Sequence, residues 1–407
     1  MPNRYLIILI LGALSTVSPL AIDMYLPAFN EIAAALHSTP AKISLSLSSY
    51  FVGLAAGQLV YGPLLDRFGR KRPLYFGLIL FMLASIFCMQ ARTVHSLVVL
   101  RFVQALGGCA AQVAAMAMVR DFFPVKDTAR ILSLLILILG VSPLLAPTIG
   151  SFVAGALGWQ WVFVVLAAFV FVMLLVVFFF LPEGHRPDTT ISLHPVPIFR
   201  NFAAILEYPQ FYTFALAGAF SFAGVLVYVA GSPIIFLDYF HVTPKGYGAI
   251  FAGLSVGFIG SNQVNIMLLR RFTSAQVFRG ALMLECAMAL FFLVGTYYQW
   301  FGLAATLVQL FILLSCLGLT YPNAAALALA PFDKNVGSAS ALLGFVQIGA
   351  AALASACVGI FNSKTIMPVL VIFAATAWIA LAIFTWGRRN LASEDPVPKN
   401  EAAAIVH

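Results

Sequence analysis

Three formal charges fall well inside long apolar stretches, and their chemistry needs explaining first: Asp23, Arg101 and Glu285. A charged side chain at the centre of a bilayer costs about 2.5–3.5 kcal/mol or more. Each of the three therefore needs a partner or a function. A carboxylate held out of bulk water near a cation can exist in charged or neutral form, which is the chemistry of a proton-binding site.

Asp23 and Arg101 are predicted to lie at similar depth. Asp23 comes late in an apolar stretch that crosses in one direction, and Arg101 comes early in a stretch that crosses in the other. We expect Asp23 to bind and release a proton and Arg101 to tune it, with Gln104, one helical turn along, as a polar partner. The alternative is a structural ion pair between Asp23 and Arg101 that fixes the two helices to each other.

Glu285 lies near the middle of its own apolar stretch. One interpretation is a carboxyl that is protonated or paired with a neighbouring helix. The other is a second proton site. An unchanged proton dependence in Glu285→Gln would favour the first.

The elements that carry these residues are predicted to be membrane-spanning helices. The 407 residues are 62% hydrophobic and 9% charged, and apolar runs of helical-span length recur from end to end. The runs lack the alternation of period two that marks a transmembrane β-barrel. We therefore expect an all-α membrane protein with twelve spans, at about 5–27, 45–65, 73–91, 96–118, 129–154, 159–181, 211–237, 247–269, 276–297, 301–329, 337–360 and 366–386.

The spans divide into two similar halves. We expect a six-helix bundle over 1–182, a cytoplasmic linker over 183–209, a second six-helix bundle over 210–390, and a disordered cytoplasmic tail over 391–407. Leu-Asp-Arg-Phe-Gly-Arg, which starts at Leu65, has a degenerate copy in Leu-Arg-Arg-Phe-Thr-Ser, which starts at Leu269, an offset of 204 residues. Six spans per half in the same orientation is a parallel repeat.

Basic residues set the predicted orientation. With both termini in the cytoplasm, 17 of the 22 Lys and Arg residues fall on the cytoplasmic side and four on the other, with Arg101 inside a span. Cytoplasmic loops collect Lys and Arg, so this bias supports twelve spans.

Two motifs resemble those of a known transporter family. Gly62-x-Leu-x-Asp66-Arg67-x-Gly69-Arg70-Lys71 resembles the loop 2–3 signature of the major facilitator superfamily. The sequence from Arg101 to Gly108 is similar to the span 4 signature of its proton-coupled drug exporters. The resemblance implies two six-helix bundles, with spans 1, 4, 7 and 10 lining a central cavity. Asp23 and Arg101 would then face the same water-filled space.

Motifs in spans 1, 5 and 7 resemble those of a subgroup within the superfamily. Gly140-Val-Ser-Pro143-Leu-Leu-Ala-Pro147-Thr-Ile-Gly150 is similar to the antiporter motif of the drug exporters, although Ala146 and Ser151 stand where that motif usually has glycine. Ala21-Ile-Asp23-Met-Tyr25-Leu-Pro27 and Gly231-Ser-Pro233 resemble the bicyclomycin/chloramphenicol-resistance (Bcr/CflA) subgroup. We expect the span 5 glycines, Gly140, Gly150 and Gly155, to pack against span 8.

The resemblance also implies a gate at the loop after span 2. Asp66 would cap a neighbouring helix or pair with a basic residue of the span 4–5 region, where Arg120 and Arg130 are candidates. Gly62 and Gly69 would allow close helix approach and a tight turn. The alternative for this loop is charge that serves topology alone.

Polar and aromatic residues inside the spans suggest a substrate pocket. An apolar, adaptable pocket suits amphiphilic compounds better than sugars. Helix–helix hydrogen bonding is the alternative for each residue. The candidates are Asp23, Tyr25, Tyr50, Gln104, Gln112, Phe220, Tyr228, Asn262, Tyr321, Asn323 and Gln347.

We therefore expect a monomeric, multi-pass transporter of the bacterial inner membrane. It would export small amphiphilic drugs or toxic compounds in exchange for protons, with membrane lipids as surroundings, no cofactor, no metal and no nucleic-acid partner. One alternative is a proton-linked carrier of a natural metabolite, such as a nucleoside or an amino acid derivative. A passive channel or a receptor is the alternative of another class. No catalytic motif indicates an enzyme.

Overall fold

The computed structural model describes residues 4–123, 125–184, 195–332, 336–360 and 365–391. Twelve long helices lie within these ranges, and the expected all-α fold class is confirmed. In the first half they are α1 (Arg4–Asp23), α3 (Pro40–Phe68), α4 (Lys71–Met89), α5 (Val94–Phe122), α6 (Val125–Leu157) and α7 (Gln160–Phe180). In the second half they are α9 (Pro209–Pro233), α10 (Pro244–Leu268), α11 (Ser274–Tyr297), α12 (Leu303–Leu329), α13 (Val336–Ile360) and α14 (Met367–Leu391).

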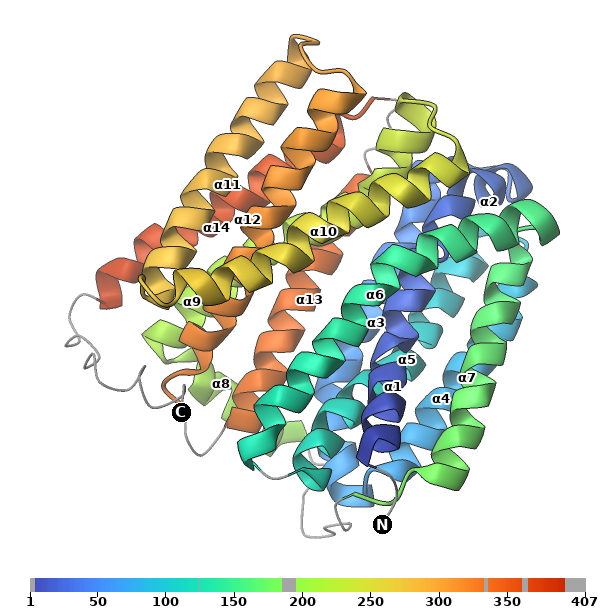
Figure 1. The fold of residues 1–407 in the computed structure, drawn as a ribbon, viewed down its shortest axis with the longest axis vertical. Coiled ribbons are helices and arrows are strands. Elements are labelled where there is room, and N and C mark those ends of the chain that lie inside the picture. The colour runs from blue at the N-terminus through green and yellow to red at the C-terminus, as the bar shows by residue number, and fades with distance from the viewer. Residues whose placement is uncertain (1–3, 124, 185–194, 333–335, 361–364, 392–407) are drawn as a thin grey trace.

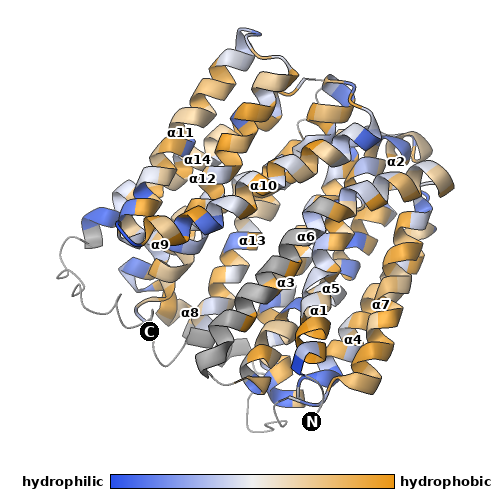
Figure 2. Cartoon of the chain, viewed as in Figure 1, coloured by the Kyte–Doolittle hydropathy of each residue, from blue (hydrophilic) through white to orange (hydrophobic). Residues whose placement is uncertain are grey.

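The helices have the length and composition of membrane spans. Among the described residues, 11 segments are long and apolar enough to cross a bilayer, and α6 contributes a further apolar stretch, Leu145–Leu157. Figure 2 shows apolar residues along the helix bodies and hydrophilic residues concentrated toward the helix ends. Backbone groups in hydrocarbon must be satisfied within the helix, which explains why nearly all of the described chain between the turns is helical.

Helix starts follow ordinary capping chemistry. Thr39, Thr93, Thr243 and Thr273 each accept a hydrogen bond from a backbone N–H in the first turn of α3, α5, α10 and α11. A side-chain oxygen at this position satisfies one of the donors that the first turn leaves free. These caps fix where each helix leaves its connecting turn.

The two halves lie side by side (Figure 1). Helices α1–α7 pack mainly on one another, as do α9–α14, and α10 crosses obliquely in front. The halves touch chiefly through α3 with α13 and α6 with α10. The expected contact between spans 5 and 8 is therefore present.

Two elements differ from the expected arrangement. The first span is not one helix, because α1 ends at Asp23 and the chain continues through the 3-10 helix η1 (Leu26–Ala28) and α2 (Phe29–Ala35). The linker contains a helix, α8 (Pro195–Leu206), which contacts α9 and α13. The expected tail lies, apart from Leu391, outside the described residues.

The halves are closed against each other at one end. We call the end that carries η1 the η1 face, and the end that carries the α3–α4 turn the turn face. Near the η1 face, Ser48 Oγ of α3 lies 2.9 Å from Ser355 Oγ of α13. At the same end Asn30 hydrogen-bonds Asp238, which lies in the π-helix η2 (Ile234–Tyr239) after α9.

Candidate functional site

The break in the first span places Asp23 at a helix end inside the protein. A proline at position 27 has no N–H to donate to the carbonyl of residue 23, so the α-helical ladder cannot continue. The chain turns instead, with the Tyr25 N–H bonded to the Ile22 carbonyl at 3.3 Å, and η1 follows. The first span therefore presents an acidic side chain where its backbone is locally unwound.

Arg101 of α5 contacts the chain just before this break. Its Nη2 donates to the Ala21 carbonyl at 3.1 Å, and its Nη1 donates to Gln104 Oε1 at 2.6 Å. The guanidinium carbon lies 4.5 Å from the Tyr25 ring centroid and 4.3 Å from that of Tyr50. Carbonyl and aromatic groups attract a desolvated cation, so these contacts support the charge of a fully buried side chain.

Gln104 extends this arrangement to a third helix. Its Nε2 donates to Ser85 Oγ of α4 at 2.7 Å. Gln104 and Ser85 are both fully buried. The predicted pairing of Gln104 with Arg101 is present, and together they connect α1, α4 and α5.

Asp23 itself forms no hydrogen bond and no ion pair with the described residues. The ion pair with Arg101, which was the alternative interpretation, is not made in this conformation, because the guanidinium is directed to the Ala21 carbonyl and two tyrosine rings. Asp23 is 5% exposed and interacts electrostatically with Tyr228 and Tyr247 of the second half. The carboxyl thus lies at the boundary between the halves.

Gly150 of the antiporter-like motif packs directly on the break. A Cβ at Gly150 would overlap the backbone carbonyl of Met24, the residue after Asp23. Gly150 was expected to pack on α10 and instead meets the end of the first span, and a Cβ at Gly155 would meet no described atom within 4 Å. The expected packing of Gly140 is untested, because that position lies outside the side chains described. Pro143 and Pro147 lie within α6 and interrupt its hydrogen-bond ladder.

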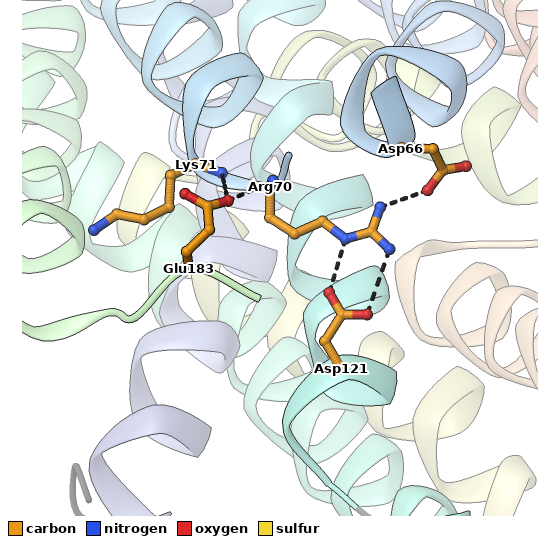
Figure 3. A network of polar contacts seen from close by, with 5 residues as sticks. All are labelled: Asp66, Arg70, Lys71, Asp121 and Glu183. Carbon is orange, nitrogen blue, oxygen red and sulfur yellow. Dashed lines mark hydrogen bonds and ion pairs between the residues drawn. The ribbon is translucent and has the colours of Figure 1, made fainter. Parts of the chain in front are cut away.

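The α3–α4 turn carries a separate cluster of charges (Figure 3). Arg70 Nη1 contacts Asp66 Oδ1 at 2.6 Å, and Arg70 Nε contacts Asp121 Oδ2 of α5 at 2.8 Å. Burial opposes the charge of Arg70, but the hydrogen bonds and charges of Asp121 and Asp66 outweigh that cost and raise the pKa of the guanidinium. Gly69 supplies the positive φ of 82° that this turn needs.

Glu183 anchors the same turn to the end of α7. One carboxylate oxygen, Oε1, accepts hydrogen bonds from the backbone N–H groups of Arg70 at 2.7 Å and Lys71 at 3.0 Å. Lys71 Nζ donates to the Leu181 carbonyl at 2.8 Å. The start of the linker is thus tied to the first residues of α4.

The expected pairing of Asp66 with Arg120 or Arg130 stays a prediction, because neither of those side chains is among the ones described. Asp66 pairs with Arg70, four residues later in the same motif, and Asp121 of α5 pairs with the same Arg70. A Cβ at Gly62 would meet no described atom within 4 Å, whereas Gly69 meets a conformational need of the turn. Sequence reasoning missed Asp121 and Glu183, although both are acids at helix ends on the side where four basic residues gather.

Glu285 of α11 belongs to a buried polar cluster in the second half. Ser221 Oγ of α9 donates to Glu285 Oε2 at 2.7 Å and lies 2.7 Å from Thr320 Oγ1 of α12. All three residues are fully buried. The cluster joins α9, α11 and α12. This arrangement agrees with the interpretation in which the Glu285 carboxyl is bonded to a neighbouring helix.

Several candidate pocket residues are engaged in helix contacts. Tyr25 and Tyr50 enclose Arg101, and Tyr25 Oη lies 2.7 Å from Ser46 Oγ. Asn323 Nδ2 of α12 donates to Asn265 Oδ1 of α10 at 2.7 Å. These side chains hold helices together in the conformation seen.

Other candidates retain free polar atoms or surface. The Tyr228 hydroxyl and Gln347 Nε2 are buried and have no hydrogen-bond partner among the residues that the structure describes. The Tyr228 ring stacks on Phe251 at 5.6 Å. Tyr321 is 37% exposed, and Gln112 and Phe220 are half-buried. The Asn262 side chain donates a hydrogen bond to the Phe258 carbonyl of the same helix.

The family follows from comparison with known proteins. The model of the Major Facilitator Superfamily matches residues 11–355. The chain belongs to the Major Facilitator Superfamily. This major facilitator protein is therefore a multi-pass membrane protein that takes a small-molecule substrate.

Curated relatives resemble it over nearly the whole chain. A bicyclomycin resistance protein homolog of Haemophilus influenzae is 30% identical over 401 residues, covering 96% of this chain and 98% of the relative. The uncharacterized MFS-type transporter YdgK of Bacillus subtilis is 32% identical, with 94% and 95% covered. The multidrug resistance protein MdtL of Shigella flexneri is 29% identical, with 94% and 96% covered.

Solved structures share the fold. A D-xylose-proton symporter superposes with a TM-score of 0.74 at 14% identity, covering 93% of this chain and 97% of the other. A bacterial homolog of the human lysosomal transporter Spinster superposes with a TM-score of 0.73 at 15% identity, with 98% and 99% covered. The predicted two-bundle superfamily fold is confirmed.

Proposed function

We propose that this major facilitator protein exports small amphiphilic or polar toxic compounds in exchange for protons. Its relatives include a bicyclomycin resistance protein homolog and multidrug resistance proteins, which are 30% and 29% identical over nearly the full length. Alternating access between the two halves moves the substrate, and the exchange of protons supplies the driving force.

The observation that carries the proposal is the setting of Asp23. The carboxyl lies at a break in α1, at the boundary of the halves, and no cation of the described chain neutralises it. Burial disfavours an isolated charge, whereas a cationic substrate or a proton removes that cost. Proton and substrate therefore compete for the same carboxyl, and their alternate binding couples the two fluxes.

Arg101 acts on Asp23 through the backbone and not through an ion pair. Its hydrogen bond to the Ala21 carbonyl fixes the last turn of α1, and hence the position from which Asp23 projects. The cation also stands at a helix C-terminus, where the helix dipole favours positive charge. Arg101 is thus a positioning residue of the coupling site.

The contacts at the η1 face are those expected of a transporter closed toward the outside. The hydrogen bonds Ser48–Ser355 and Asn30–Asp238 join the halves at the η1 face. From the bias of basic residues we infer that the turn face lies in the cytoplasm, that both termini are cytoplasmic, and that the membrane is the bacterial inner membrane. The η1 face is then the closed, outer end.

A growth-inhibition panel tests the function. Cells that overexpress the wild-type chain are compared with cells that express Asp23→Asn at equal membrane abundance. We expect the wild type to raise the inhibitory concentration of at least one amphiphilic compound, and Asp23→Asn to abolish that increase. Equal protection by both variants would remove Asp23 from the mechanism.

The direction of transport separates export from the metabolite-carrier alternative. In proteoliposomes, pH gradients of each sign are imposed on the same preparation. Antiport drives substrate against the proton flux, so substrate accumulates in the acidic compartment. Accumulation in the alkaline compartment would identify a proton symporter, and equilibration without accumulation a channel.

A further inference from the structure

A groove between α3 and α4 at the turn face has no role in the transport site. Its volume is about 360 Å³, which falls within the range of small-molecule sites. Apolar side chains and one cation form it: Tyr61, Leu64, Phe68, Arg72, Pro73 and Phe76. Tyr61 and Phe68 are seven residues apart on α3, which corresponds to about 10 Å along the helix axis.

The groove is continuous with the outer surface of the bundle. Phe76 is 63% exposed and Phe68 is 40% exposed. Both lie beside the α3–α4 turn, where a span meets the headgroup region. Exposed aromatic side chains are typical of that depth. A hydrocarbon chain can therefore reach the groove laterally from the bilayer.

Arg72 differs from its neighbours in the turn. Arg70 is held by Asp66 and Asp121, Lys71 by the Leu181 carbonyl, and Arg67 lies over the Phe68 ring. Arg72 is exposed and forms no hydrogen bond or ion pair with any residue that the structure describes. It also lies in the first turn of α4, where the helix dipole disfavours a cation and favours an anion.

We propose that this groove binds an anionic phospholipid, with an acyl chain against the apolar wall and the headgroup phosphate on Arg72. The cation and the apolar slot lie where the two parts of such a lipid meet, at the membrane interface. Basic pockets between spans on the cytoplasmic side attract anionic headgroups. The site is independent of Asp23 and of the substrate.

Native mass spectrometry of the purified full chain tests the proposal. The protein is incubated with an equimolar mixture of dioleoyl phosphatidylglycerol and dioleoyl phosphatidylcholine, which share their acyl chains and differ in headgroup charge. We expect the one-lipid adduct of the wild type to favour phosphatidylglycerol. Arg72→Gln should lower that preference about fivefold, the effect of one basic residue near the surface.

Two variants control for charge and folding. Arg389→Gln removes an exposed cation from the end of α14 on the same face and should change the preference less than twofold. Arg72→Lys keeps the cation and should retain the preference. An equal loss in Arg72→Gln and Arg389→Gln, or no loss in Arg72→Gln, would overturn the site and leave Arg72 as topological charge.

A third variant and a soluble competitor test the groove itself. Leu64→Trp fills the slot, keeps every charge, and should lower the occupancy of phosphatidylglycerol. Binding unaffected by Leu64→Trp would mean that no acyl chain occupies the groove, which contradicts the proposal. Glycerol phosphate should not displace the lipid; full displacement would identify a site for soluble phosphates instead.

Discussion

At the residue scale, the Arg101 guanidinium is the group whose burial most needs compensating contacts. It is fully buried, and no carboxylate among the described residues pairs with it. Two tyrosine rings lie against the guanidinium, the Gln104 amide oxygen accepts a hydrogen bond from Nη1, and the Ala21 carbonyl accepts one from Nη2. The compact ammonium group of a lysine cannot make all of these contacts at once.

Replacing Arg101 by Lys should therefore destabilise the protein although the charge is kept. We expect a loss of about 2 kcal/mol in the free energy of unfolding, the value of a desolvated cation–π contact. Denaturant unfolding in detergent measures it. The control is Arg92→Lys, at an exposed position in a connecting turn, where we expect a change within about 0.5 kcal/mol. Equal stability of Arg101→Lys and the wild type would show that charge alone matters.

Glu285 gives a second prediction at this scale. Its carboxylate oxygen accepts a hydrogen bond from Ser221, and a glutamine carbonyl can accept the same bond. We expect Glu285→Gln to transport with the wild-type pH dependence in proteoliposomes. A shifted pH profile, with the protein still folded, would instead make Glu285 a second proton site.

Single residues were predictable where the physical cost was local. Asp23, Arg101 and Glu285 stand out because charge is rare in apolar stretches. Their partners depend on which helices meet, and that information is tertiary. Asp121 and Glu183 were missed for the same reason, since they lie 51 and 113 residues from Arg70 in the chain.

At the element scale, the break in the first span depends on α6. The backbone of α6 approaches the Met24 carbonyl at Gly150, where a side chain would not fit. Pro147 lies one turn earlier and leaves a gap in the hydrogen-bond ladder of α6. The antiporter-like motif thus shapes the surface against which the Asp23 break rests.

Gly150→Ala should impair transport because α6 must move away from the break. Overpacking of this kind costs about 1–3 kcal/mol, so we expect a fall in rate of about tenfold. Gly155→Ala is the matched control, since a Cβ there meets nothing within 4 Å. Proton-driven uptake of a fluorescent substrate measures both. Equal activity of the two variants would show that the contact between Gly150 and the break does not matter for transport.

Helix number and order were predictable from apolar length, but breaks and short helices were less so. Pro27 accounts for the end of the α-helical ladder in the first span, but the contact of Arg101 with the Ala21 carbonyl beside the 3-10 turn at Leu26–Ala28 is tertiary and could not be predicted. Helix α8 was not predicted because the surrounding linker is polar and contains several prolines. Its packing on α9 and α13 stabilises it, and that contact is not visible in the sequence.

At the scale of the whole molecule, the two halves meet at the η1 face. Alternating access requires those contacts to separate when the outer side opens. Ser48 and Ser355 lie on the most extensive contact between the halves, α3 with α13. A covalent link at this pair should therefore hold the protein in one state.

A Ser48→Cys, Ser355→Cys double variant should lose transport on oxidation and regain it on reduction. The hydroxyl oxygens are 2.9 Å apart, close enough for a disulfide after small adjustment. Each single variant, oxidised in the same way, controls for reaction of the native cysteines. Full transport by the cross-linked double variant would show that the halves do not separate here.

The two-bundle architecture was predictable because repeat, charge bias and span length agree. The closure of the η1 face could not be predicted, since the inward-facing and outward-facing states of a transporter bury similar residues. The choice between them depends on long-range contacts such as Asn30 with Asp238.

The central claim is that Asp23 couples proton and substrate movement, and one measurement tests it directly. Wild type and Asp23→Asn are reconstituted in proteoliposomes, and uptake is followed with and without an imposed pH gradient. We expect Asp23→Asn to lose accumulation driven by the gradient while it retains exchange of labelled for unlabelled substrate. Accumulation by Asp23→Asn at the wild-type level under the same gradient would contradict the account.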